Sequence, residues 1–144
     1  MPRRRVLTEA QLESLLALPV VEADLIRHWT LVPTDLPAVE RRRGGHNQLG
    51  YALQLCAFRF PGRLLRPSEA IPEAAIFFVA GQLRIGAGAL AAYATRHQTR
   101  REQLDGLRDT FGFRMYVPGH GRELLAWLLP WRWPPPTPST SQRR

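Results

Sequence analysis

Lysine is absent from the sequence, so all 20 of its basic residues are arginine. Cysteine occurs once, at Cys56, which excludes a disulfide framework and a cysteine-based metal cluster. Long apolar runs are missing as well. No stretch approaches the length of a transmembrane helix, and the basic start at residues 1–5 is not followed by the apolar run of a signal peptide. We therefore expect a cytoplasmic protein without a membrane partner.

Catalytic motifs are also missing. Acidic residues are scattered along the chain, and no separated set of them suggests a two-metal carboxylate site. The four histidines show no ligand spacing, and the pair Gly86-x-Gly88 follows an expected helix rather than the strand that a dinucleotide-binding loop requires. We therefore expect no catalytic residue, no metal, no cofactor and no enzyme activity.

An excess of positive charge is the strongest feature that is present. Twenty basic residues stand against 12 acidic ones, which gives a formal net charge of +8. Guanidinium groups hold phosphates in a planar, two-pronged geometry, so an all-arginine surface suits a polyanion such as nucleic acid. A GC-rich genome, which favours arginine codons, explains the same composition, and one sequence does not separate the two explanations.

The remaining composition favours one folded, helical domain. The chain has 144 residues, of which 44% are hydrophobic, enough for a core. Thr8 and Gln11 form a T-x-x-Q capping box for a first helix, which Pro19 ends. Further helices are expected at about 22–29, from 34–35 to 41–43, at 46–60, 72–83, 89–96 and 98–111, and around 124–128.

No segment alternates with the period of a strand over a useful length. The expected fold class is therefore all-α, a compact bundle of about seven to eight short helices. Residues 1–130 are expected to form the helical domain. The Pro-rich residues 131–144 are expected to form a disordered tail.

Positive charge is concentrated in one part of the chain. Between Arg41 and Arg66 there are six arginines and no acidic residue. His46 and Asn47 interleave with them and are able to contact phosphates or base edges, so this block favours nucleic-acid binding. A solvated face, or a set of salt bridges to a protein partner, is the alternative. The six arginines are Arg41, Arg42, Arg43, Arg59, Arg63 and Arg66.

A second candidate region has the spacing of a helix-turn-helix. Ala80, position 84 and Leu90 match a small residue at the crossing, a turn and an apolar anchor, but Arg84 stands where glycine is usual. An ordinary packed helix pair explains the spacing as well. The side chains best suited to read DNA follow directly: Arg96, Gln98, Thr99, Arg100 and Arg101.

One longer pattern is more specific than any of these features. The run R-R-R-G-x-H-N-x-L-G-x-A-L-Q-L-C occupies residues 41–56. Together with residues 2–8, 98–102 and 123–130, it resembles the N-terminal region of replicative transposases of the Tn-three type. The similarity covers about residues 1–130 and stops after Pro130, as expected of a truncated or frameshifted chain.

The resemblance implies that this region binds double-stranded DNA at the terminal inverted repeats of a transposon, in the bacterial nucleoid. It places the catalytic acidic triad far downstream, so only DNA binding carries over. The alternatives are a helical assembly domain, which pairs with a transposase catalytic region or a dimer partner, and a non-functional remnant. The candidate DNA-binding residues are Arg41, Arg42, Arg43, His46, Asn47, Arg59, Arg63, Arg66, Arg96, Gln98, Thr99, Arg100 and Arg101.

Overall fold

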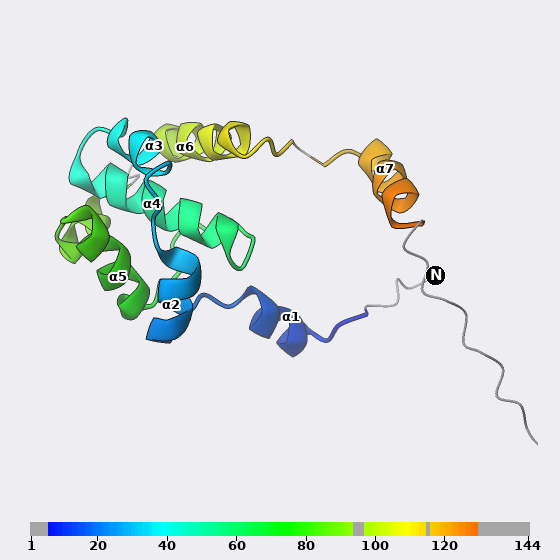
Figure 1. Ribbon diagram of the computed structural model, residues 1–144, viewed down its shortest axis with the longest axis horizontal. Helices are drawn as coiled ribbons and strands as arrows, with labels where there is room; N and C mark the ends of the chain where they lie inside the picture. Colours follow the sequence, from blue (N-terminus) through cyan, green and yellow to red (C-terminus); the bar gives the residue numbers. More distant parts are fainter. Residues whose placement is uncertain (1–5, 94–96, 115, 130–144) are drawn as a thin grey trace, which may run out of the picture. The chain divides into compact units, whose positions relative to one another are not determined.

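The computed structural model describes residues 6–93, 97–114 and 116–129. These residues form seven α-helices and one 3₁₀ helix and no strand, which confirms the expected all-α class (Figure 1). The elements are α1 (Glu9–Leu16), α2 (Glu22–Trp29), α3 (Leu36–Glu40), α4 (Gly45–Arg59), α5 (Glu73–Leu83), η1 (Ala87–Ala92), α6 (His97–Thr110) and α7 (Pro118–Leu128). The chain divides into two compact units, one up to Phe111 and one from Gly112.

Helix α1 begins at the predicted capping box. The Gln11 backbone N–H donates to the Thr8 hydroxyl at 3.2 Å, and the Thr8 backbone N–H donates to the Gln11 side-chain oxygen at 2.9 Å. Two backbone N–H groups that the helix leaves open are thereby satisfied.

Helix α4 is the centre of the first unit. It contacts α2, α3, α5, η1 and α6 (Figure 1). Every residue from Leu49 to Ala57 is buried, including Tyr51 and Gln54. In the sequence, Leu49, Leu53 and Cys56 recur at helical spacing, which predicts one apolar face for this helix. Over residues 49–57 that expectation is wrong, because neighbouring elements cover this part of α4 on all sides, while Arg59 at the end of the helix is exposed.

The core joins α2 and α5 to α4. Trp29 is fully buried, and its indole N–H donates to the carbonyl of Phe60 at 2.9 Å. Ala75, Val79 and Ala80 bury the inner face of α5. Small side chains at two of these three positions let the helix backbones approach closely.

The region after α5 differs from the expectation. Arg84 ends α5 in the left-handed conformation, with φ 56° and ψ 38°. Residues 87–92 then form a short 3₁₀ helix, and Tyr93 is extended, with φ −68° and ψ 130°. The helix predicted over 89–96 is thus a 3₁₀ helix that ends at Ala92, because Tyr93 leaves the helical conformation where its ring packs on α4, and residues 94–96 lie outside the described residues. The described residues show no helix-turn-helix at this place.

The second unit is described from Gly112 to Leu129, apart from residue 115. Helix α7 begins at Pro118 and has no buried residue. An ion pair between Arg114 and Glu123, 2.7 Å long, links the segment before α7 to the helix itself. The predicted tail, residues 131–144, lies outside the described residues.

Candidate nucleic-acid interface

The three consecutive arginines lie where α3 passes into α4. The backbone N–H groups of Arg41 and Arg42 donate to the carbonyls of Pro37 and Val39, which closes α3. Gly44 follows with φ 83°, a conformation that favours glycine, and no side chain caps the start of α4. The arginines are therefore held next to the open N-terminal end of a 15-residue helix.

A cleft of about 310 Å³ opens beside them. Its lining residues are Arg41, Arg42, Arg43, Asn47, Glu102 and Gln103. The first four of these residues are candidates from the sequence, and the structure brings them together. Glu102 and Gln103, both on α6, form the opposite wall of the cleft. Arg41 and Arg43 are exposed, and within the described part of the chain their guanidinium groups make no ion pair or hydrogen bond. Asn47 donates to the Arg43 carbonyl at 2.9 Å.

Arg42 lies differently from its two neighbours. Its guanidinium carbon is 4.2 Å from the centre of the Tyr51 ring, which is completely buried. The Nε atom of Arg42 is buried without a hydrogen-bond partner in the described residues. The middle arginine therefore points toward the interior of the unit rather than into solvent.

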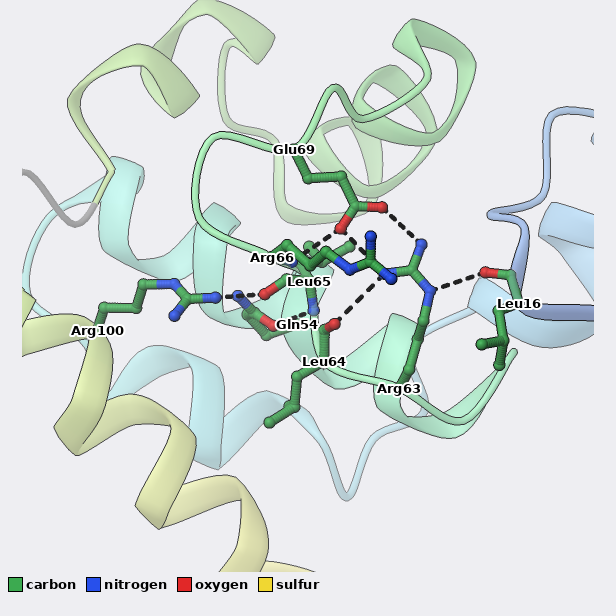
Figure 2. A network of polar contacts seen from close by, with 8 residues as sticks. All are labelled: Leu16, Gln54, Arg63, Leu64, Leu65, Arg66, Glu69 and Arg100. Atoms are coloured by element: carbon green, nitrogen blue, oxygen red, sulfur yellow. Dashed lines mark hydrogen bonds and ion pairs between the residues drawn. The ribbon is translucent and has the colours of Figure 1, made fainter. Parts of the chain in front are cut away.

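Arg59 and Arg63 have carboxylate partners within the chain. Arg59 donates to both oxygens of Asp35, at 2.8 and 2.9 Å. Arg63 donates to both oxygens of Glu69, at 2.9 and 2.6 Å, and to the carbonyl of Leu16 at 2.8 Å (Figure 2). Arg63 uses two nitrogens and so forms a bidentate pair, while a single nitrogen of Arg59, Nη2, donates to both oxygens of Asp35. Both arginines are thereby paired inside the chain and hold elements together.

The same network reaches α6. The backbone N–H of Arg66 donates to Glu69, and Arg100 donates to the carbonyl of Leu65 (Figure 2). Arg66 and Arg100 also line a second cavity, of about 340 Å³, together with Tyr93. The Tyr93 hydroxyl donates to Gln103 at 2.8 Å, which connects this cavity to the cleft.

The other candidates are placed less fully. His46 is half-buried beside Gly44, and Arg101 is exposed on α6. Gln98 and Thr99 belong to the first turn of α6, and only their backbone is described. Arg96 lies outside the described residues.

Gln103 is a further residue of the cleft, outside the set that the sequence pattern indicated. Its side chain is 3% exposed and forms part of the cleft wall. Gln103 and Leu107, which is fully buried, are four residues apart and share the inner face of α6. The helical period of the sequence places position 103 on the buried face of α6, so it could have predicted a buried polar residue there.

Among the residues that the structure describes, three groups have displaced pKa values. The hydrogen bond from Arg63 lowers the pKa of Glu69. Burial raises the pKa of Tyr93, and burial raises the pKa of Cys56 to about 12. A thiol with so high a pKa is neutral and unreactive at pH 7, so Cys56 acts as a core residue.

In residues 6–93, 97–114 and 116–129, no three His, Cys, Asp or Glu side chains gather as metal ligands would. None of the described helices is both long and apolar enough to span a membrane.

Comparisons with known proteins give consistent matches. A family described as a domain of unknown function, DUF4158, matches residues 6–133. The transposase for transposon Tn21 of Escherichia coli is 45% identical over 128 residues, which cover 89% of this chain and 13% of the transposase. The transposase for transposon Tn501 of Pseudomonas aeruginosa is 42% identical, over 75% of this chain and 11% of the transposase.

A more distant relative is the transposase for transposon Tn1546 of Enterococcus faecium. It is 30% identical over 125 residues, 87% of this chain and 13% of the transposase. The chain thus spans about 13% of the length of the first relatives that it matches.

Proposed function

The chain belongs to the DUF4158 family and is related to bacterial transposases, as the sequence pattern predicted, and we propose that it is a DNA-binding module for transposon terminal inverted repeats. It would act on DNA in the bacterial nucleoid. Binding, and no chemical step, is assigned to this chain.

The cleft between residues 41–47 and α6 carries the proposal. Arg41 and Arg43 are exposed, have no carboxylate partner among the described residues, and lie beside the N-terminal end of α4. Cations and a helix N-terminus both attract phosphate. Asn47, which is half-buried in the same cleft, has an amide group of the kind that recognises adenine edges, whereas Gln103 is buried and accepts from the Tyr93 hydroxyl.

The remaining candidates take different parts in the proposal. Arg66 and Arg101, which are exposed, would contact phosphates. Arg59 and Arg63 support the fold through their ion pairs with Asp35 and Glu69. Gln98 and Thr99, which belong to the first turn of α6, are assigned to DNA contact as well.

A binding titration tests this function. The chain is titrated against a duplex that carries a terminal inverted repeat of a related transposon and against a scrambled duplex, each at two salt concentrations. We expect about tenfold tighter binding to the repeat, equal to about 1.4 kcal/mol.

Arg43→Ala should weaken binding to both duplexes and make the slope of log K against log [salt] shallower by about 1. Arg27→Ala is the matched control, because Arg27 is exposed on α2, outside the cleft. Equal, weak binding to both duplexes would contradict repeat recognition. A flat salt dependence would instead favour an assembly role, since protein partners rarely give a steep slope.

A further inference from the structure

The side chain of Arg42 is enclosed by two helices. On one side, its guanidinium carbon lies 4.2 Å from the centre of the Tyr51 ring of α4. On the other side, its Nη2 atom is 3.1 Å from the point that a Cβ on Gly106 of α6 would occupy. Arg42 therefore fills the space between α4 and α6 at a position where α6 has no side chain.

The backbone of Arg42 is fixed as well. Its N–H donates to Val39 at 3.0 Å, and its carbonyl accepts from the Gln48 side chain at 3.1 Å. With the main chain held at both groups, the direction of the side chain is set by the junction of α3 and α4. The fold itself therefore fixes the position of Arg42.

Burying part of the Arg42 side chain costs folding free energy. A role in phosphate binding alone does not explain why the side chain is buried. Its Nε and the Tyr51 hydroxyl are both buried without a hydrogen-bond partner among the described residues. Buried donors without partners are destabilising. An arginine that served only to meet phosphate would lie outward, as Arg41 and Arg43 do.

We propose that Arg42 is a positioning residue: it holds α6 against α4 so that Gln103 faces Arg41 and Arg43 across the cleft, and it does not itself neutralise a phosphate. This role rests on the proposed DNA binding. Of the three consecutive arginines, Arg41 and Arg43 then contact the DNA, and Arg42 holds the two helices together.

The shape of the guanidinium group suits this role. A planar cation stacks on an aromatic face over its whole area, whereas an ammonium group is a compact point charge. Lysine at position 42 therefore keeps the charge but loses the flat contact with Tyr51. The Arg42→Lys substitution therefore distinguishes a residue that holds α6 against α4 from a residue that only supplies positive charge to a phosphate.

Three variants of the full chain, Arg42→Ala, Arg42→Lys and Arg43→Ala, test the assignment. Binding to the repeat duplex is measured over a range of salt, and amide hydrogen exchange is measured along the chain. For both Arg42 variants we expect weaker DNA binding with an unchanged salt slope, and faster exchange in α6 than in α4 and α5. For Arg43→Ala we expect a slope shallower by about 1 and unchanged exchange in α6.

Gly106→Leu provides a second route if the Arg42 variants do not fold. A leucine there displaces the guanidinium group while Arg42 and the core of α4 stay intact. We expect faster exchange in α6 and weaker binding with an unchanged slope. Gly81→Leu on α5 is the control, because nothing lies within 4 Å of a Cβ at that position.

Two results would overturn the assignment. One is a shallower slope for Arg42→Ala together with near-normal binding for Arg42→Lys, which identifies a phosphate contact. The other is unchanged α6 exchange in all Arg42 and Gly106 variants. If the unsubstituted chain shows no salt-dependent DNA binding, the proposed function fails, whereas hydrogen exchange in α6 still decides whether Arg42 holds the helix.

Discussion

Gly50 sets how closely Tyr93 approaches α4. A Cβ at Gly50 would lie 2.0 Å from Cδ2 of Tyr93, far inside any real contact. The ring therefore packs directly on the helix backbone, and from there the Tyr93 hydroxyl reaches Gln103. One missing side chain thus allows α4, the end of η1 and α6 to meet.

Gly50→Ala should lower the free energy of unfolding by about 1–3 kcal/mol, because the added methyl group collides with an enclosed ring. Gly81→Ala is the matched control. It adds the same group to a helix where nothing lies within 4 Å, so it should stabilise the chain by up to about 1 kcal/mol. Urea denaturation of both variants measures the difference, and equal effects would disprove the role of Gly50.

At the scale of elements, the connection from α4 to α5 depends on one carboxylate. Glu69 accepts from the Arg63 side chain and from the Arg66 backbone, and Arg63 in turn reaches the C-terminal end of α1 (Figure 2). The elements on either side are thereby held by polar contacts as well as by apolar packing.

Glu69→Gln should destabilise the chain by about 1–2 kcal/mol at pH 7. Because Arg63 lowers the pKa of Glu69 in the folded chain, the contribution is fully present above the ordinary value of 4.5 and is lost as the pH falls below it. The difference in unfolding free energy between the two proteins should therefore shrink toward pH 3. Glu13→Gln, on the exposed face of α1, is the control and should show no such difference.

At the scale of the whole molecule, the basic residues have separate tasks. Arg59 and Arg63 neutralise internal carboxylates, and Arg42 lies between helices. Net charge alone therefore overstates the number of cations that face a ligand.

The salt dependence of DNA binding should reflect this smaller number. Six phosphate contacts, the number of arginines from residue 41 to residue 66, would give a slope of log K against log [salt] near −5. With contacts from Arg41, Arg43, Arg66 and Arg101, we expect about −3 to −4. Titrations at four or more salt concentrations measure the slope, and a value of −5 or steeper would show that more arginines than these four meet DNA.

The stability of the whole chain should also fall in alkali because of Cys56. Burial raises its pKa to about 12 from an ordinary value of 9.0, so the folded chain holds the proton more tightly than the unfolded chain. This contribution is complete below pH 9 and is lost as the pH rises toward 12, by about 1.4 kcal/mol per pH unit.

The comparison of Cys56→Ala with the unsubstituted chain isolates this effect from other groups that titrate in alkali, Tyr93 among them. In urea denaturation, the stability advantage of the unsubstituted chain should be about 1.4 kcal/mol smaller at pH 10 than at pH 7.5. An identical pH dependence of the two proteins would contradict the assignment.

Local signals in the sequence determined most of the helices. The capping box at Thr8 starts α1, and the Arg41–Gly45 segment separates α3 from α4, as predicted. These signals work because caps, glycines and prolines act within a few residues of their own backbone. The all-α class and the family both follow from such short-range patterns.

The tertiary structure alone decided what each arginine does. Residues 41, 42 and 43 are identical in type, yet α6 and Tyr51 enclose only the middle one. Arg59 and Arg63 look like part of a basic surface in the sequence, but Asp35 and Glu69 arrive from other segments and pair with them. Burial and ion pairing depend on residues that are distant along the chain. The sequence therefore locates the charge, and the packing of helices decides which of it faces a ligand.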